Sequence, residues 1–411
     1  MDITLNASEI GKINSEIQIS GSKSESNRLL ILQKLFSNLE IENLSDSDDS
    51  EHMQEALASV KNRVDIGHAG TAMRFLTSYF AIQENREVIL TGSERMQNRP
   101  IRILVEALRS LGASIDYVDK EGYPPLQIKG VPLKTNQVAI QGDVSSQYIS
   151  SLLLIGASLP QGLEIELLGE VTSIPYIKMT LALLNQVGIQ TNFEDNRIVV
   201  LPLSEQNEKV IVVESDWSSA SYYYSIIALA EVGSEIQLSA YKKESLQGDS
   251  CLAEIYEHFG VLTNFNKNSI ILQKVEQHSY ESLDLDLRNA PDIAQTIAVT
   301  CFALGVPCNL TGLHTLKIKE TDRLVALEKE LTKFGAEISI TDKSLHLNKS
   351  SDFNSEVSVE TYNDHRMAMA FAPLAMKVPL SVQDANVVTK SYKSFWRDLQ
   401  SLGFTISELQ N

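Results

Sequence analysis

Three short segments in the second half of the sequence place acidic groups or a histidine directly beside arginine or lysine. They are RNAPDIAQTIAV with Asp292, LKIKETDRLVAL with Lys317, Lys319, Glu320, Asp322 and Arg323, and NDHRMAMAFA with Asp364, His365 and Arg366. Acids and bases beside cations can hold dianionic ligands and transfer protons. An ordinary charged first turn of a helix is the alternative for each segment alone. Together they favour an anion-binding site with acid/base chemistry.

A second candidate site lies near the N-terminus, in SGSKSESNRLLIL (Ser20 to Leu32). Gly and Ser residues precede an apolar, helix-compatible run that carries Lys23 and Arg28. The start of a helix presents unbonded backbone N–H groups, and serine hydroxyls with a lysine and an arginine complete a cradle for an anion. A helix cap without a ligand is the alternative. The two added cations favour binding.

Other segments of the first half carry further candidate contacts. In GHAGTAMRFL, Gly70 would let a backbone amide approach a phosphate or carboxylate closely. In RMQNRPIRILVEAL, three arginines form either a binding edge or a solvated basic face, and they are Arg95, Arg99 and Arg102. In GDVSSQYISSLLL and SIPYIKMTLALL, polar residues either cap helices or bind a polyhydroxylated acid, and they are Ser145, Ser146, Gln147, Ser173 and Tyr176.

Several other chemistries are not expected. His365 has no second His or Cys at metal-ligand spacing, so the sequence predicts no metal site. No nucleophile is paired with a base in a triad pattern, and neither a Walker-type phosphate loop nor a dinucleotide-binding GxGxxG occurs. The residues therefore predict an acid/base enzyme that needs no cofactor.

The overall charge makes the positions of the cations informative. The chain has 411 residues, 43% of them hydrophobic, and its 35 Lys and Arg against 53 Asp and Glu give a formal charge of −18. Such an acidic surface repels nucleic acids and anionic membranes. An anionic substrate must therefore be captured by a local cluster of cations.

The elements that position these residues recur along the chain. A helix-like amphipathic segment ending in Gly, followed by a short alternating strand, occurs five times, with the glycines at Gly112, Gly188, Gly260, Gly335 and Gly403. Glycine just past a helix C-terminus allows a left-handed turn into a strand. The regular spacing predicts an α/β subdomain copied several times. Helix-Gly-strand turns that are common in any α/β protein are the alternative.

Other features place the chain among cytosolic proteins. The N-terminal residues 1–17 alternate like a strand and lack the pattern of a secretory signal, and no apolar run approaches the length of a membrane span. Cys251, Cys301 and Cys308 lie in or beside apolar runs, which favours buried thiols in a reducing compartment. The acidic run Asp46 to Glu51 is a break in the periodicity.

The motifs resemble those of a known family. The segments SGSKSESNR, GHAGTAMR, NRPI, DVSSQ, APDIAQTIA, KIKETDRL, YNDHRMAM and VVTKSYKSF are similar, in order and approximate spacing, to those of 5-enolpyruvylshikimate-3-phosphate synthases, the carboxyvinyltransferases of the shikimate pathway. The resemblance covers essentially the whole chain.

The resemblance implies an α/β (α+β) fold, a two-domain inside-out α/β barrel in which each domain is a pseudo-threefold assembly of βαβαββ subdomains. One domain would be residues 21–214, and the other would combine 1–20 with 215–411, with the active site in the interdomain cleft. It also implies a cytoplasmic enzyme, expected to be a monomer, that acts on phosphoenolpyruvate and shikimate 3-phosphate and uses no cofactor or metal.

The resemblance further implies a role for individual residues. The contacts to shikimate 3-phosphate would be Lys23, Ser24, Arg28, Ser145, Ser146, Ser173, Tyr176, Asp292, Thr315 and Lys319. The contacts to phosphoenolpyruvate would be Lys23, Gly70, Arg99, Gln147, Arg323, Arg366 and Lys390. Asp292 would accept the proton of the attacking hydroxyl, and Glu320 would protonate the methylene carbon. Lys23, His365 and Lys390 would assist with charge and protons.

Four positions depart from the family pattern. His68 stands where Asn is usual, Phe75 and Lys393 stand where Pro is usual, and Thr315 takes the place of a substrate-binding Asn. Each change is expected to affect affinity or inhibitor sensitivity. None removes a predicted acid, base or principal cation, so activity is still expected.

Three alternatives differ in what they explain. The homologous transferases that act on a UDP-linked amino sugar usually carry a reactive Cys in the first half, whereas the cysteines here all lie beyond residue 250. A catalytically silent binding protein should have lost some of the acids and cations. A generic anion-binding α/β protein explains the glycine loops but not the ETDR and DHR clusters.

Overall fold

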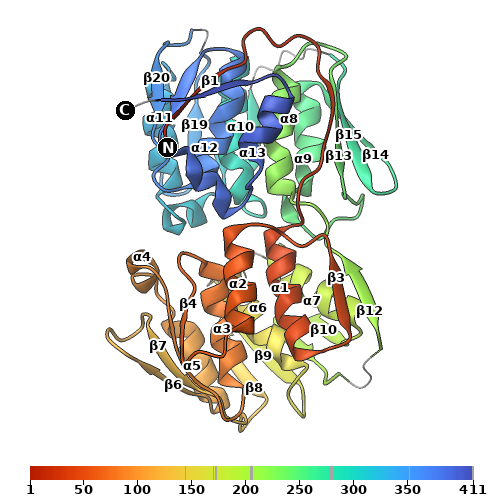
Figure 1. Cartoon of the computed structure of the whole chain (residues 1–411), viewed down its shortest axis with the longest axis vertical. Helices are drawn as coiled ribbons and strands as arrows, with labels where there is room; N and C mark the ends of the chain where they lie inside the picture. The colour runs from red at the N-terminus through yellow and green to blue at the C-terminus, as the bar shows by residue number, and fades with distance from the viewer. Residues whose placement is uncertain are drawn as a thin grey trace. The chain divides into compact units, whose positions relative to one another are not determined.

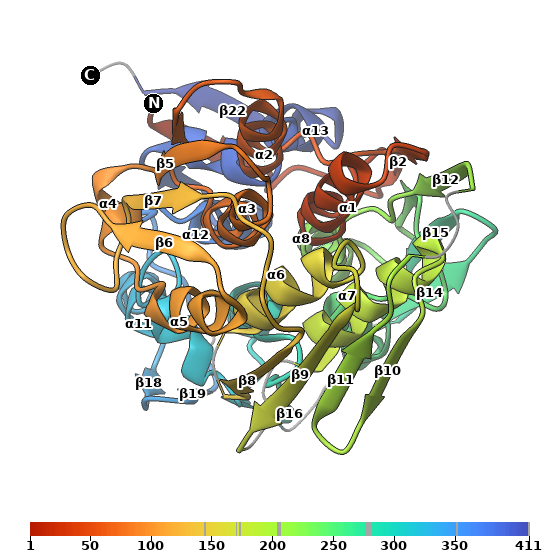
Figure 2. The same ribbon diagram turned by 90° about the horizontal axis from the view of Figure 1, so that it is seen from below.

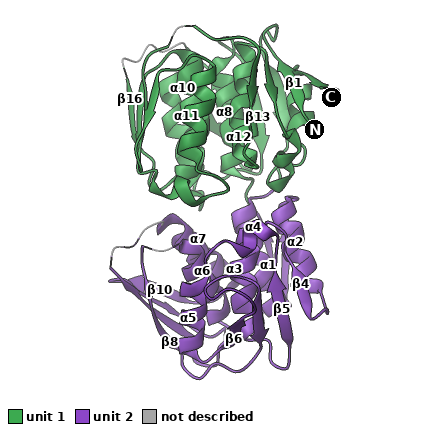
Figure 3. Ribbon diagram, turned by 90° about the vertical axis from the view of Figure 1, so that its left-hand side faces the viewer, with its two compact units in different colours: residues 1–20, 214–411 green, residues 21–213 purple. Residues whose placement is uncertain are grey.

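The computed structural model describes residues 1–143, 145–169, 171, 174–203, 207–276, 282–350 and 352–409. The chain divides into two units (Figure 3). One is Gly21–Val213, and the other combines Met1–Ser20 with Glu214–Asn411. Figure 1 follows the chain through both units from the N-terminus to the C-terminus.

The five predicted glycine turns are confirmed. Each glycine follows a helix with φ between 71° and 104°, a region that a residue with a Cβ atom rarely adopts. The helices are α5 (Arg102–Leu111), α7 (Ile174–Val187), η2 (Tyr256–Phe259), α11 (Arg323–Lys333) and α13 (Phe395–Ser401). The strands that follow are β6 (Ser114–Tyr117), β10 (Thr191–Glu194), β14 (Val261–Phe265), β18 (Ile338–Ile340) and β22 (Thr405–Glu408).

The unit of residues 21–213 repeats one strand and helix pattern. Its other elements are α1 (Lys23–Leu35), β3 (Leu39–Glu42), α2 (Asp48–Ala58), β4 (Arg63–Asp65), α3 (Gly70–Ala81), β5 (Glu87–Thr91), α4 (Glu94–Gln97), β7 (Leu126–Lys129), β8 (Gln137–Gln141), α6 (Ser146–Gly156), β9 (Leu163–Leu168), β11 (Arg197–Val200) and β12 (Lys209–Val212). Sheets β4-β5-β7-β6 and β8-β9-β11-β10 each join a parallel pair to two antiparallel strands. Strand β12 pairs in parallel with β3.

Helices α1, α3 and α6 contact one another and form the centre of this unit. Figure 2 shows them between the sheet that contains β5 and the sheet that contains β9. Most of their side chains are buried, including several hydroxyls, and the Oγ atoms of Ser78 and Ser151 lie 2.6 Å apart between α3 and α6. These helices are therefore covered on all sides, which is the inside-out arrangement, and their first turns carry the motifs of the first half.

The described residues of the other unit form three four-stranded sheets of the same pattern. Their orders are β16-β17-β19-β18, β2-β13-β15-β14 and β20-β21-β1-β22. The strands not yet given are β1 (Ile3–Asn6), β2 (Asn14–Ile17), β13 (Glu235–Ser239), β15 (Ser269–Lys274), β16 (Leu283–Asp286), β17 (Cys308–Thr311), β19 (Leu345–Leu347), β20 (Val357–Val359) and β21 (Leu380–Val382). The predicted N-terminal strand is confirmed, and it is divided into β1 and β2. β1 belongs to the sheet β20-β21-β1-β22, and β2 belongs to the sheet β2-β13-β15-β14.

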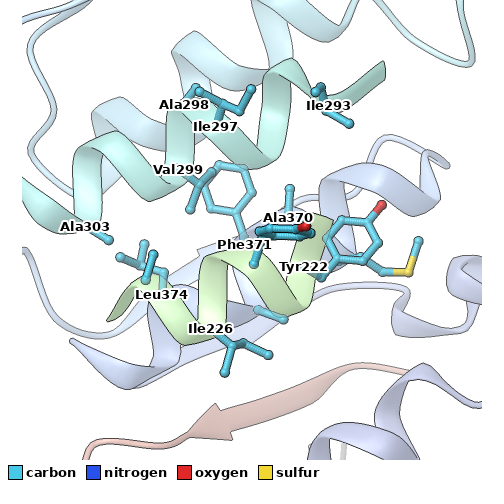
Figure 4. Close-up of a cluster of buried hydrophobic side chains, with 14 of the residues drawn as sticks. Tyr222, Ile226, Ile293, Ile297, Ala298, Val299, Ala303, Ala370, Phe371 and Leu374 are labelled. Carbon is cyan, nitrogen blue, oxygen red and sulfur yellow. The ribbon is translucent and has the colours of Figure 1, made fainter. Parts of the chain in front are cut away.

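The remaining elements of this unit are α-helices and 3-10 helices. They are α8 (Trp217–Leu229), η1 (Gly248–Cys251), α9 (Leu252–Ile255), η3 (Pro291–Ile293), α10 (Ala294–Leu304), η4 (His314–Ile318), α12 (His365–Phe371), η5 (Ala372–Met376) and η6 (Ala385–Lys390). Helices α9 and α10 each follow directly from a 3-10 turn. Figure 4 shows side chains of α8, α10 and α12 packed together, among them Tyr222, Ile297 and Phe371, all less than 2% exposed. Burying each of these side chains stabilises the unit by roughly 1.5–3 kcal/mol.

Candidate functional site

Capping residues fix the helix starts of the unit that contains the C-terminus. The carboxylates of Asp216, Asp322 and Asp364 are the N-caps of α8, α11 and α12, and each accepts a hydrogen bond from a backbone N–H of the first turn. An aspartate at this position fixes the helix start and favours it electrostatically. The residues that follow these caps, among them Arg323 and Arg366, are thereby placed in first turns.

Arg323 is the centre of this site. It is buried, and its guanidinium donates to three carboxylates. Nε lies 2.7 Å from Oδ2 of Asp364, Nη1 lies 2.8 Å from Oδ1 of Asp292, and Nη2 lies 2.8 Å from Oε2 of Glu320. Burial alone would lower the pKa of Arg323, but the three carboxylates outweigh it and raise that pKa. The cation therefore fixes both predicted acid/base residues relative to one another.

Asp292 is surrounded by cations. Its carboxylate lies 3.2 Å from Nζ of Lys319 and 3.5 Å from Nη2 of Arg366, in addition to Arg323. Burial raises the pKa of Asp292, but Lys319, Arg366 and Arg323 together hold that pKa well below its usual range. Before any ligand binds, Asp292 is thus an ionised carboxylate and a weak base.

Lys390, His365 and Thr315 belong to the same unit. Nζ of Lys390 donates to the backbone oxygen of Asn363, 2.7 Å away, directly before the Asp364 cap. His365 is buried, and its Nδ1 lies 3.9 Å from Asp364. Oγ1 of Thr315 is buried and has no hydrogen-bond partner among the described residues. The hydroxyl of Thr315 is thus available to a polar ligand group.

A second group of predicted residues gathers at the first turns of α3 and α6 in the unit of residues 21–213. Nε2 of Gln147 donates to Oγ1 of Thr71 over 3.2 Å, which joins the two helix starts. The guanidinium of Arg99 lies against Gly70, so closely that a Cβ atom at position 70 would collide with Nη1. The phenol of Tyr148 donates to the backbone oxygen of Pro100 over 2.7 Å, which fixes the segment that carries Arg99. Glycine at 70 therefore makes room for a cation beside a helix N-terminus.

Arg74 adds a second guanidinium at the same place. Its Nη1 donates to the backbone oxygen of Gly70 over 2.9 Å, while its Nε is buried without a hydrogen-bond partner among the described residues. Burial, followed by repulsion from Arg99, lowers the pKa of Arg74 to about 10. Arg74 is thus a buried cation with an unsatisfied Nε and with a second cation beside it. Such a pair of guanidiniums favours a bound anion.

Lys23 and Ser24 lie in the first turn of α1, and Arg28 lies in its second turn. Nζ of Lys23 lies 3.4 Å from Oδ2 of Asp49 in the first turn of α2. Arg28 is buried and donates to the backbone oxygen of Ser24 and to the hydroxyls of Thr180 and Ser150. A substrate would reach Arg28 by exchanging one of these bonds, whereas Lys23 and Ser24 are partly exposed.

The remaining predicted residues of this unit are placed as follows. Ser145 is the N-cap of α6, Ser146 is buried in its first turn, and Tyr176 lies in the first turn of α7. Ser173 lies outside the described residues. Of the three arginines in the RMQNRPIR segment, Arg99 faces Gly70, whereas Arg102 is paired with glutamates and Arg95 is exposed. Among the positions described, Arg99 is therefore the arginine of this segment that lies beside the start of α3.

Comparison with known proteins identifies the family. The model of the EPSP synthase (3-phosphoshikimate 1-carboxyvinyltransferase) family matches residues 7–64 and 56–399. The chain belongs to the EPSP synthase family. It is 44% identical over 399 residues to a 3-phosphoshikimate 1-carboxyvinyltransferase of Bacteroides fragilis, with 96% of this chain and 97% of the relative covered. It is 33% identical over 432 residues to a Mannheimia haemolytica protein of the same name, with coverage of 97% and 99%.

The fold agrees with a solved EPSP synthase. The structure of the Acinetobacter baumannii protein matches with a TM-score of 0.80 at 19% identity, covering 99% of this chain and 100% of that one. The predicted two-domain inside-out α/β fold is thereby confirmed, and so is the family predicted from the motifs.

Two departures from the EPSP synthase motifs have visible contacts. Nδ1 of His68 lies 2.9 Å from Oγ of Ser93, the N-cap of α4, so His68 links the glycine loop to the segment before Arg99. The ring of Phe75 lies 5.3 Å from the guanidinium carbon of Arg28, at cation–π distance. These two residues therefore lie beside predicted site residues.

Sequence reasoning missed several residues of the site. The run Asp46 to Glu51 is no simple break, because it contains the Ser47 cap and the first turn of α2, from which Asp49 meets Lys23. A serine followed by acidic residues is a helix-start signal that could have been used. Asp249 and Ser218 also approach Arg366, and no motif indicated them.

Neither a metal centre nor a membrane helix is found where the chain is described. The described His, Cys, Asp and Glu residues form no group of three or more that could hold a metal ion. No described helix is long and apolar enough to cross a membrane. Cys301 and Cys308 are buried thiols, as predicted, and Cys251 is partly buried.

Proposed function

We propose that this protein transfers the enolpyruvyl group of phosphoenolpyruvate to the 5-hydroxyl of shikimate 3-phosphate and releases phosphate, a step of aromatic amino acid biosynthesis. Family membership supports the reaction. The observation that carries the proposal is Asp292, a carboxylate held by Arg323, Arg366 and Lys319 next to Glu320. One cluster thus combines a base, an acid and the cations that anionic substrates require.

The reaction is an addition followed by an elimination. The 5-hydroxyl attacks C2 of phosphoenolpyruvate and loses its proton to Asp292, while C3 gains a proton from Glu320. The product is a tetrahedral ketal with a methyl group. Phosphate then leaves C2, and the methyl group loses a proton, which restores the carbon–carbon double bond. Lys23, His365 and Lys390 assist with charge and protons.

The cations explain how the low pKa of Asp292 is compatible with a base. In the enzyme without substrates, Lys319, Arg366 and Arg323 stabilise the ionised carboxylate of Asp292, which makes it a poor proton acceptor. The phosphate and carboxylate groups of the substrates compete for the same cations. Their binding therefore raises the pKa of Asp292 in the complex and prepares it to accept a proton.

The proposed substrate contacts form two groups, one for each substrate. The contacts to shikimate 3-phosphate are Lys23, Ser24, Arg28, Ser145, Ser146, Ser173, Tyr176, Asp292, Thr315 and Lys319. The contacts to phosphoenolpyruvate are Lys23, Gly70, Arg99, Gln147, Arg323, Arg366 and Lys390. The pairing of Gly70 with Arg99, and the exposure of Lys23 and Ser24, support these assignments. Within a chain of charge −18, such local cations are what an anionic substrate needs.

The domain roles and the setting complete the proposal. Residues 21–214 form a substrate-binding domain, and 1–20 with 215–411 form the domain that carries Asp292 and Glu320. The enzyme works in the cytoplasm, and it acts as a monomer. The monomer is supported by the fact that one chain contains every proposed site residue. Sedimentation at increasing protein concentration tests the monomer, and a single species of about the chain mass is expected.

Phosphate release tests the activity directly. Purified protein is given phosphoenolpyruvate with shikimate 3-phosphate or with UDP-N-acetylglucosamine, and Asp292→Ala is assayed in parallel. We expect release with shikimate 3-phosphate alone and a loss of roughly 10²- to 10⁴-fold in the variant. Release with the UDP sugar would reassign the acceptor. No release with either acceptor would leave a binding protein as the better explanation.

A further inference from the structure

Arg366 is connected to a buried carboxylate that the proposed reaction does not use. Nη2 of Arg366 donates to Oγ of Ser218 over 3.1 Å, in the first turn of α8. Oγ of Ser218 in turn donates to Oδ2 of Asp249 in η1. Asp249 is 6% exposed and lies in a segment that none of the sequence motifs includes.

The direction of this hydrogen-bond chain is fixed by chemistry. A guanidinium can only donate, so the hydroxyl of Ser218 must accept from Arg366. Its single proton is then directed to Asp249, which accepts. Nη2 of Arg366 thus has two contacts, one with Asp292 over 3.5 Å and one with Ser218, which links it to the buried carboxylate of Asp249.

We propose that Ser218 and Asp249 are positioning residues for Arg366 and hold its guanidinium in the orientation that binds phosphoenolpyruvate. This inference rests on the proposed function, because it takes Arg366 as a contact to that substrate. Asp292 attracts Arg366 toward the acid/base cluster. The hydrogen bond to Ser218 adds a second restraint on the same Nη2 atom, so that the orientation of the guanidinium does not depend on Asp292 alone.

The charged groups around Asp249 predict a dependence on pH. Asp292, Arg366 and Asp216 face it, and Cys251 follows it in η1. Burial, followed by repulsion from Asp292, raises the pKa of Asp249 to about 6. Asp249 is therefore an anion at pH 8 and largely protonated at pH 5.

Steady-state kinetics of Ser218→Ala and Asp249→Asn test the proposal. Because each change weakens a hydrogen bond that involves a charged group, we expect the KM for phosphoenolpyruvate to rise roughly tenfold at pH 8. The KM for shikimate 3-phosphate should change less than about twofold. Ser225→Ala, which removes another buried hydroxyl of α8 that bonds to Thr300, is the matched control and should leave both values unchanged.

The pH dependence separates positioning from a merely structural role. The ratio of the KM for phosphoenolpyruvate of Asp249→Asn to that of the wild type should fall toward one between pH 8 and pH 5, because Asp249 becomes neutral in the wild type. Titration of the substrate cancels in this ratio. A ratio that stays constant over this range would contradict the proposal.

Thermal unfolding gives an independent readout. In the folded state the pKa of Asp249 is raised above its unfolded value. The free energy of unfolding therefore falls as the pH rises from about 4 to 6, and the whole cost of ionising Asp249 is present above pH 6. Asp249→Asn should therefore keep or raise the Tm at pH 8 while it weakens phosphoenolpyruvate binding. A lowered Tm with unchanged KM would make Asp249 structural and overturn the inference.

Failure of the proposed function would be recognised separately. If the wild type releases no phosphate, the proposed reaction fails. Calorimetric titration of phosphoenolpyruvate into the wild type, Ser218→Ala and Asp249→Asn then decides the inference by itself. Weaker binding by both variants supports it, and equal binding, or none to any of the three, overturns it.

Discussion

Buried guanidiniums in the two units differ in what surrounds them. In the unit of residues 21–213, Arg28 donates to hydroxyls and a backbone oxygen, and Arg74 lies beside Arg99. Burial lowers the pKa of both Arg28 and Arg74 to about 10. In the other unit, burial acts on Arg323 and Arg366 as well, but carboxylates outweigh it and raise their pKa.

This difference indicates a division of tasks. A buried cation without a carboxylate carries an uncompensated desolvation penalty, which an anionic ligand relieves. A buried cation among carboxylates is already compensated and instead fixes the geometry of acids and bases. We therefore expect the cations of the unit of residues 21–213 to act mainly in binding, whereas those of the unit that contains Asp292 and Glu320 also hold the acid and base in place.

The largest effect is expected at Arg323. Arg323→Met leaves Asp364, which is fully buried, without its principal cation, and breaking a buried ion pair costs about 3–5 kcal/mol. Arg28→Met should cost less, about 1–3 kcal/mol, because Arg28 donates to hydroxyls and a backbone oxygen rather than to carboxylates, and Ser150 and Thr180 still bond to each other. Urea unfolding measures both free energies.

An exposed ion pair provides the control for this comparison. Arg288 pairs with Asp286 at 2.8 Å with most of its side chain exposed. Arg288→Met should change stability by about 1 kcal/mol or less. If Arg28→Met proves as destabilising as Arg323→Met, the contrast between the two units is wrong.

A smaller effect, on binding rather than stability, is expected at Gly70. Gly70→Ala places a Cβ atom against the guanidinium of Arg99 and displaces that flexible group. The KM for phosphoenolpyruvate should rise roughly tenfold, the loss of about one charged hydrogen bond. The Tm should change little, because Ala is a favourable helix residue. Gly11→Ala, where a Cβ atom meets nothing within 4 Å, is the matched control.

The smallest effect concerns the pH dependence of catalysis. A base loses activity as pH falls through its pKa, and kcat/KM reports the free enzyme whereas kcat reports the complex. In the enzyme without substrates, cations hold the pKa of Asp292 well below its usual range. Substrates that compete for these cations should raise this pKa. The pH below which kcat falls should therefore be about one unit higher than the pH below which kcat/KM falls. Coincident pH values would mean that the substrates do not relieve these cations.

The sequence alone determined the local features of this protein. Helix starts at Ser-Gly and Asp residues and the five glycine turns follow from interactions within a few residues, and the structure places them where the patterns predict. The N-terminal strand was visible as an alternating pattern, although distant strands pair with it. The same local motifs carried the family resemblance. Lys319, Glu320 and Arg323 could therefore be named in advance, since one short segment before and at the start of α11 contains them all.

Only the tertiary structure decided which of these residues meet. Asp292, Arg323 and Asp364 lie 31 and 41 residues apart in sequence, and they meet because the fold brings η3 and the starts of α11 and α12 to one place. Asp249 and Ser218 belong to no charged motif and join the site through a hydroxyl, which leaves no periodicity to detect. Burial, and with it the direction of each pKa shift, depends on the packing of residues distant in sequence, which local patterns do not specify.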